Sequence, residues 1–127
     1  MRGASAIENL LASNSDPKLR VLVVWEPILS TDFRPPGRSV LARISDQRAK
    51  QFWDPEHAVA QELSRIAKER PGGPAPACCV SKGFHWDEAI VYAPGSQWKQ
   101  MPTAVFWNGP VVREMTGIEK AVHRSDR

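Results

Sequence analysis

The sequence predicts an α/β fold, a sandwich in which helices flank a mixed sheet. Three observations favour it: an unbroken apolar run at residues 21–24, a clear helix start at Asp54, and two apolar strands between residues 88 and 107. A strand that is apolar at every position is typical of a central strand in a parallel sheet, buried on both faces. Alternating strands and helices, closed by a strand pair and a last helix, indicate layered packing. The length of 127 residues predicts a single domain, residues 1–127.

The first part of the chain predicts a helix, a strand and two short helices in that order. Residues 3–13 form the first helix, because Ile7, Leu10 and Leu11 recur at helical spacing. The buried strand covers residues 20–25, and a loop rich in proline covers residues 30–38. The two short helices have these apolar positions: Val40, Leu41 and Ile44 in the first, and Ala49, Phe52 and Trp53 in the second, which begins at Ser45 or Asp46.

The clearest helix start in the sequence is at Asp54. Its carboxylate suits an N-cap, and Pro55 suits the first helical position because its missing N–H would be unpaired there anyway. The apolar face of this helix consists of Val59, Leu63 and Ile66. Pro71 ends it and opens a connection rich in proline, glycine and alanine up to residue 77.

The last part predicts a turn, three strands and a helix. The turn covers residues 81–83, and a strand covers residues 88–93. Pro102 opens the next strand, which runs to Trp107, because a proline cannot donate inside a ladder. Asn108 and Gly109 then predict a type I′ hairpin into the apolar pair Val111 and Val112. A final helix runs from Gly117 to about His123.

Composition and charge narrow the function classes. The net charge of +3 comes from interspersed acidic and basic residues, which is typical of a solvated surface and not of a nucleic-acid interface. No apolar run is long enough for a membrane span, and the first residues lack the apolar core of a signal peptide. We therefore expect a cytoplasmic protein that binds neither nucleic acid nor membrane. No phosphate loop, nucleophile elbow or familiar zinc spacing is present, so we expect no cofactor and no hydrolase activity.

Four segments carry a family resemblance. They are residues 23–29 (VVWEPIL), 52–54 (FWD), 86–94 (WDEAIVYAP) with Trp98 after it, and 101–109 (MPTAVFWNG). In this order they resemble the thioredoxin superfamily, in particular a branch of uncharacterised bacterial thioredoxin-like proteins. The resemblance covers nearly the whole chain and implies a thioredoxin-like sandwich. It leaves open whether residues 90–92 or 104–107 form the third strand of that fold.

One motif of the superfamily is missing from this sequence. Redox members of the superfamily carry Cys-x-x-Cys at the start of the first helix, after the first strand, where the helix dipole lowers the pKa of the attacking thiol. Here the first helix starts almost at Met1, with no strand or Cys-x-x-Cys before it. Either that segment lies upstream of Met1 or the chain is a non-redox copy. In the superfamily the proline matching Pro102 is cis and faces the cysteines; here Pro102 is either that proline or a trans residue that opens the strand.

The candidate site residues fall into three groups. Cys78 and Cys79 are the only cysteines and weak candidates for catalysis. Their adjacency disfavours a disulfide because it would close a strained ring, so we expect inert or partly buried thiols. With His85 they are weak candidates for a metal site, since thiolates suit soft ions. The candidate binding residues are Trp25, Glu26 and Pro27 at the end of the buried strand, and Met101 and Pro102 before the last one.

Two functions follow from these residues. The first is a non-catalytic thioredoxin-like protein that binds a protein partner or a second copy of itself, because Cys-x-x-Cys is missing. A missing first strand would also leave a strand edge open for pairing. The second is a thiol–disulfide oxidoreductase whose active segment lies upstream of Met1, or which uses Cys78 and Cys79. For this chain we favour the first function.

Overall fold

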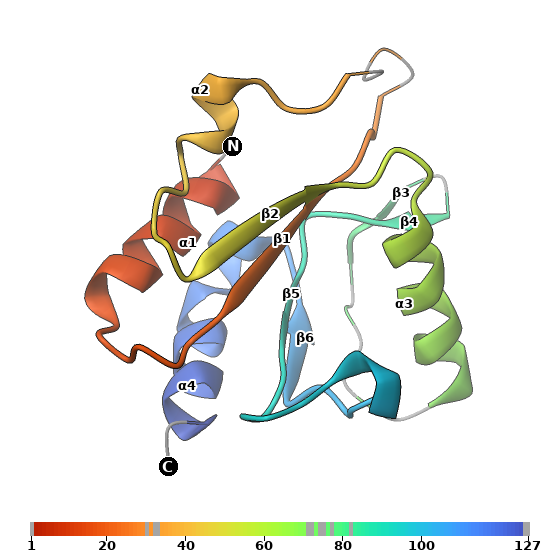
Figure 1. The fold of residues 1–127 in the computed structure, drawn as a ribbon. Helices are drawn as coiled ribbons and strands as arrows, with labels where there is room; N and C mark the ends of the chain where they lie inside the picture. The colour runs from red at the N-terminus through yellow and green to blue at the C-terminus, as the bar shows by residue number, and fades with distance from the viewer. Residues whose placement is uncertain are drawn as a thin grey trace. The chain divides into compact units, whose positions relative to one another are not determined.

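The computed structural model describes residues 2–29, 31, 34–70, 73, 76, 78–81 and 83–125, which form a mixed α/β structure (Figure 1). The chain divides into two compact units, Met1–Glu62 and Leu63–Arg127, which are described one at a time. Most of the predicted 71–77 connection, and parts of the predicted 30–38 loop and 81–83 turn, lie outside the described residues. None of the described helices is long and apolar enough to cross a bilayer.

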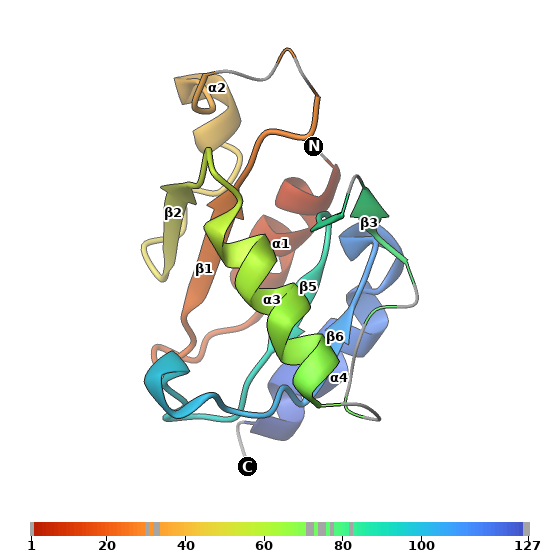
Figure 2. The ribbon, with the colours of Figure 1, turned by 90° about the vertical axis from the view of Figure 1, so that its right-hand side faces the viewer.

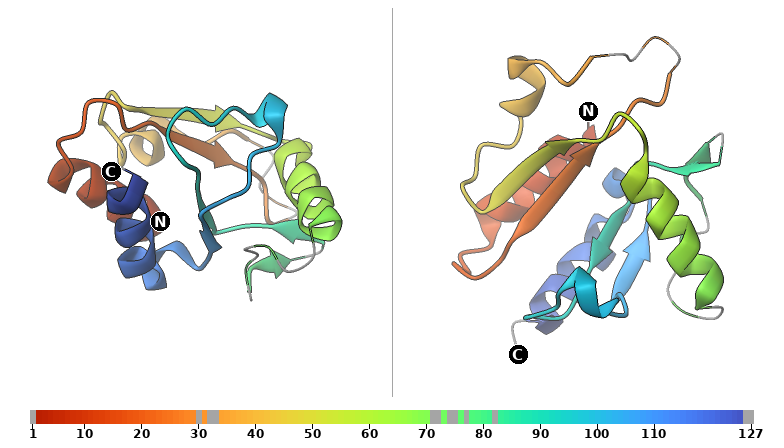
Figure 3. Two further views of the ribbon diagram at one scale, coloured as in Figure 1. Left: turned by 90° about the horizontal axis from the view of Figure 1, so that it is seen from below. Right: turned by 45° about the vertical axis from the view of Figure 1, so that its right-hand side comes forward.

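The first unit is built around two parallel strands. Its elements are α1 (Arg2–Ser13), β1 (Val21–Trp25), α2 (Arg38–Leu41), β2 (Ala49–Trp53) and the start of α3 (Ala58–Glu69). The strands pair in register from Val21 opposite Ala49 to Trp25 opposite Trp53, and they run side by side in Figure 3. The helix predicted over residues 3–13 is confirmed as α1. The buried apolar side chains of this unit are Leu10, Leu11, Ile44 and Ala60.

The predicted burial of β1 on both faces is wrong. Leu22 is 66% exposed and Val24 is 37% exposed, whereas Val21, Val23 and Trp25 on the other face are half-buried. Within the described residues, β1 pairs with β2 alone, so it forms half of a two-stranded sheet. An unbroken apolar run permits one buried face as readily as two, and what packs against each face of the sheet decides between them.

The predicted short helix over residues 45–53 is also wrong, because residues 49–53 form β2. Ala49, Phe52 and Trp53 have the spacing of a helical face, which led to that prediction. In the structure, burial alternates instead: Lys50 and Phe52 are exposed, and the three residues between and beside them are half-buried. The ladder with β1 outweighs a weak local helical preference.

Arg48 ties the end of α1 to the start of β2. Its guanidinium donates to the carbonyl oxygens of Leu11, Asn14 (2.6 Å) and Asp16 (3.0 Å), and to the carboxylate of Asp46 (2.7 Å). The last carbonyls of a helix have no partner inside it, and a cation there also favours the helix dipole. The hydrogen bonds from Arg48 hold the pKa of Asp46 at about 2, below its usual range.

The long helix α3 begins later than predicted. The Asp54 carboxylate does cap it, accepting from the amides of Ala58 (3.0 Å) and Val59 (2.9 Å). Pro55 nevertheless lies before the helix, which starts at Ala58. His57 intervenes with a positive φ of 57°, and this left-handed residue allows the chain to turn back so that Asp54 reaches the amides.

The second unit contains two antiparallel strand pairs and the last helix (Figure 2). Its elements after α3 are β3 (Val80–Ser81), β4 (Phe84–His85), β5 (Ala89–Val91), η1 (Trp98–Gln100), β6 (Phe106–Asn108), η2 (Val111–Arg113) and α4 (Met115–Ser125). Helix α4 packs against β5 and β6. The buried apolar side chains are Leu63, Trp107, Val111, Ile118, Ala121 and Val122. The strands predicted over 88–93 and up to Trp107, and the last helix, are therefore confirmed with shifted ends.

The predicted hairpin at Asn108 and Gly109 is wrong. Strand β6 pairs back with β5, with Trp107 opposite Ile90, and the short helix η2 follows in place of a returning strand. Pro110 has no N–H to donate to a returning ladder, which explains why no hairpin forms. The Gly109–Pro110 peptide bond is cis, and it is the only cis bond among the described residues, so the bond before Pro102 is trans.

Gly117 gives a test of the contact between α4 and β6. A Cβ at this position would lie 2.6 Å from the ring of Phe106. Alanine favours a helix interior over glycine by about 1 kcal/mol, but overpacking of a core costs about 1–3 kcal/mol. We expect Gly117→Ala to lower the free energy of unfolding measured by chemical denaturation. Gly37→Ala is the control, because no atom lies within 4 Å of its added carbon; equal effects of the two substitutions would contradict the packing described.

Candidate functional site

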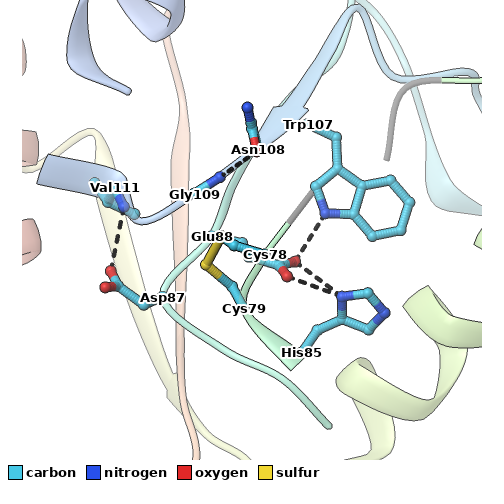
Figure 4. Close-up of a disulfide and its surroundings, with 9 residues drawn as sticks. All are labelled: Cys78, Cys79, His85, Asp87, Glu88, Trp107, Asn108, Gly109 and Val111. Carbon is cyan, nitrogen blue, oxygen red and sulfur yellow. Dashed lines mark hydrogen bonds and ion pairs between the residues drawn. A yellow bond between two sulfur atoms is a disulfide. The ribbon is translucent and has the colours of Figure 1, made fainter. Parts of the chain in front are cut away.

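The candidate site is a disulfide between the neighbouring residues Cys78 and Cys79, immediately before β3 (Figure 4). The two Cα atoms are 3.7 Å apart, and both residues are half-buried. The prediction of two free thiols is therefore wrong. Residue order alone does not reveal the backbone conformation that allows neighbouring sulfurs to bond, and here Cys79 adopts a left-handed φ of 71°.

Strand β4 and the residues after it hold the Cys79 backbone in place. Val80 pairs with His85 in the short β3–β4 ladder, and the amide of Trp86 donates to the carbonyl oxygen of Cys79 (3.0 Å). The chain then turns at Asp87, which has a positive φ of 52°. Strand β4 and Trp86 therefore fold back onto the backbone of Cys79 and Val80.

Gly109 closes the site from the end of β6. A Cβ here would clash with the carbonyl oxygen of Asp87 and lie 3.1 Å from the sulfur of Cys79, so only glycine allows this close approach. Val111 fixes the approach, because its amide donates to the Asp87 carbonyl oxygen (3.2 Å). The sulfur of Cys79 thus lies close to the backbone of Gly109, the residue that follows β6.

Beside the disulfide lies a buried cluster of Glu88, His85 and Trp107 (Figure 4). The Glu88 carboxylate accepts from Trp107 Nε1 (2.8 Å) and lies 2.9 Å from His85 Nδ1. The side chains of His85 and Glu88 are 9% and 5% exposed. Burial raises the pKa of Glu88 above its usual range, although both hydrogen bonds act in the opposite direction. An ionised Glu88 only accepts, so Nδ1 then carries the proton.

The three weak metal candidates do not form a ligand set in this structure. Cys78 and Cys79 are bonded to each other, and His85 directs Nδ1 at Glu88. A metal would need deprotonated thiolates, which the disulfide removes. Within the part of the chain that the structure describes, no three His, Cys, Asp or Glu residues are placed to hold a metal ion.

Trp25, Glu26 and Pro27 lie at the end of β1, in the first unit. Trp25 Nε1 donates to Gln51 Oε1 (2.9 Å), so this indole is held against β2. The Glu26 carboxylate lies 3.1 Å from His57 Nδ1, with side chains 11% and 14% exposed. Pro27 is half-buried. The sequence gives no sign of the Glu26–His57 pair, since His57 reads as a surface residue in a helix.

Met101 and Pro102 belong to the second unit, where Pro102 lines a small hollow. Arg70 donates to the carbonyl oxygen of Met101 and to Thr103 Oγ1 (3.3 Å). Pro102 lines the hollow, and so does Tyr92, whose pKa is raised by burial. The other lining residues are Ile66, Ala67, Arg70, Gly73, Thr103, Ala104 and Trp107.

Glu88 is a site residue that was not predicted from the sequence, although the sequence carries a signal for it. In a strand, alternate residues share a face, so a Glu immediately before the apolar run 89–91 lies on the same face as Ile90. A charged residue on an apolar face calls for a buried partner. That partner is Trp107, which stands opposite Ile90 in the ladder.

Comparisons with known proteins add no relative: no protein-family model, no curated protein and no solved structure matches this chain.

Glu88 gives a prediction about pH. Because the pKa of Glu88 is raised in the folded state, there is a pH range in which Glu88 is protonated in the folded protein and ionised in the unfolded chain. The free energy of unfolding should therefore fall as pH rises from the ordinary glutamate pKa of 4.5 through the raised pKa of Glu88 in the folded protein. Glu88→Gln should remove this part of the pH dependence, measured by denaturation at a series of pH values. Glu119→Gln, at an exposed position of α4, should leave it in place. Parallel curves for Glu88→Gln and the unsubstituted protein would argue against the raised pKa.

Proposed function

We propose that Cys78 and Cys79 are a redox couple and that the protein exchanges disulfides with dithiols of other proteins. The observation that carries the proposal is the disulfide between adjacent residues. A disulfide stabilises a fold mainly by closing a loop in the unfolded chain, and the stabilisation grows with loop length. With a sequence separation of one there is no loop to close. A structural staple is therefore a poor account of this bond, and redox chemistry is a better one.

The exchange reaction balances without a cofactor. A partner dithiol loses two electrons and two protons and becomes a disulfide, while the Cys78–Cys79 bond breaks and both sulfurs become thiols. The reverse reaction reduces a partner disulfide. The attacking species is a thiolate, so the rate depends on thiolate fraction and on access to the sulfur. Both cysteines are half-buried and not enclosed in the core, which provides that access.

We place this couple in a thioredoxin-like fold, also as a proposal. Its support is the order of elements: a parallel pair β1–β2, then α3, then the antiparallel pair β5–β6, then α4. The whole sequence has no Cys-x-x-Cys, so the couple would lie away from the place where redox members of that superfamily carry theirs. A Cys-x-x-Cys upstream of Met1 would be a second couple and not a substitute for this one.

A non-catalytic binding function is the second candidate, and the outer face of β1 and β2 favours it. Leu22 and Phe52 are 66% and 50% exposed, and Phe52 stands opposite Val24 on the same face. Contiguous exposed apolar side chains are typical of interaction surfaces. This candidate needs no redox change at the disulfide, so the two functions make different predictions in a reduction assay.

Insulin reduction with dithiothreitol as the electron donor separates the two functions. We expect the protein to speed up the precipitation of reduced insulin several-fold over dithiothreitol alone. Cys78→Ser and Cys79→Ser should both abolish the acceleration, because either substitution leaves one sulfur without its partner. A thiol titration of the untreated protein should find none, and two after reduction. Absence of acceleration by the unsubstituted protein would overturn the redox function and favour binding.

A further inference from the structure

Strand β3 begins at the residue after the disulfide and pairs on one side. Within the part of the chain that the structure describes, β4 is its one neighbour in a sheet. The other side of β3 is therefore an edge, and its first residue, Val80, is 56% exposed. The backbone groups of an edge strand can pair with an extended segment of another chain. This edge lies next to the disulfide in the chain, so it offers a partner a place to bind beside the candidate site.

The pairing with β4 shows which backbone groups face this edge. The amide of Trp86 donates to the carbonyl oxygen of Cys79, one step beyond the pair of Val80 with His85. Hydrogen-bonded and non-hydrogen-bonded pairs alternate along antiparallel strands, so Val80 and His85 form a non-hydrogen-bonded pair. The N–H and C=O of Val80 consequently point away from β4. Among the described residues, no hydrogen bond joins either group to a residue outside the β3–β4 pair.

We propose that the edge of β3 binds an extended, cysteine-containing segment of the partner protein as an added antiparallel strand. The inference rests on the proposed redox function and names how its partner is recognised. The disulfide selects a partner with a thiol. The edge selects an extended segment, because a helix already uses its N–H and C=O groups in internal hydrogen bonds. The antiparallel direction is the more stable one per residue.

Val80 fixes the register of the added strand. In an antiparallel strand, the residue opposite Val80 precedes the residue opposite Cys79. When the residue before the partner's cysteine pairs with Val80, the cysteine therefore lies beside Cys79, about 4.8 Å away in the adjacent strand. The residue before the cysteine donates its N–H to the Val80 carbonyl oxygen and accepts from the Val80 N–H. Its side chain lies beside the exposed side chain of Val80, which favours a β-branched residue there.

The reaction at this position balances. The partner's thiolate forms a bond to one sulfur of the disulfide, the Cys78–Cys79 bond breaks, and the other sulfur leaves as a thiolate that takes a proton from solvent. A second thiol of the partner, as a thiolate, then attacks the partner's own sulfur in the mixed disulfide. This forms the partner's disulfide and releases the remaining cysteine as a thiolate. The edge contributes by holding the thiol beside the disulfide.

The test varies the partner and leaves the protein unchanged, which avoids any question of misfolding. The probe is the blocked peptide Thr-Thr-Val-Cys-Thr, and mass spectrometry of the intact oxidised protein follows the rate of mixed-disulfide formation. N-methylation of the valine amide removes the donor to Val80 and should slow the reaction about tenfold. N-methylation of the threonine before it is the matched control. That amide points to the other side of the added strand, so the rate should not change.

Equal rates for the two methylated peptides would overturn the binding of an added strand. Glutathione, which is too short to form that strand, separates this failure from a failure of the proposed function. If the protein forms a mixed disulfide with glutathione and treats all the peptides alike, the redox function stands and the edge inference is wrong. If it forms none with any thiol, both are wrong. A dimer found by sedimentation, with the peptide rate falling as the dimer forms, would assign the edge to a second copy and would also overturn the inference.

Discussion

The second unit depends most on one buried carboxylate, that of Glu88. Removing a carboxylate from water costs free energy, and the hydrogen bonds from Trp107 and His85 offset that cost. Each of the three strands joined in this way, β4, β5 and β6, has three residues or fewer. Strands this short bury little apolar surface on their own. The carboxylate is therefore a polar centre around which the short strands are arranged.

The candidate site takes its geometry from the same segment. His85 and Glu88 belong to the cluster, and between them Trp86 donates to the carbonyl oxygen of Cys79. Asp87 then makes the contacts that hold the end of β6 against the sulfur of Cys79. Of these four consecutive residues, the outer two belong to the buried cluster, and the inner two hold the backbone around Cys79. A substitution in the cluster would therefore displace Trp86 or Asp87, because each of them is joined by one peptide bond to a residue of the cluster.

Elements with strong local signals were predicted correctly from the sequence. Elements whose structure depends on a contact with a distant segment were not. Helix α1 and the body of α3 follow from apolar residues at helical spacing, and β5 follows from three consecutive apolar residues. Strand β2 needed its partner β1, because residues 49–53 carry a pattern that suits either element. Pro110 was the overlooked local signal that rules out the hairpin. The disulfide was rejected because adjacency suggests strain, and the left-handed conformation of Cys79 cannot be inferred from composition. The adjacent pair was nevertheless named as a candidate from its residue type alone.

A bond between neighbours has a short range of influence. Most disulfides connect distant parts of a chain, so their reduction changes the stability of the whole fold. Here the bond spans one peptide unit, and the surrounding backbone is held by hydrogen bonds that do not involve sulfur. A change in oxidation state would therefore alter the structure only close to Cys78 and Cys79. A molecule that contacts these residues would detect the change, whereas the conformation of the rest of the chain would stay the same.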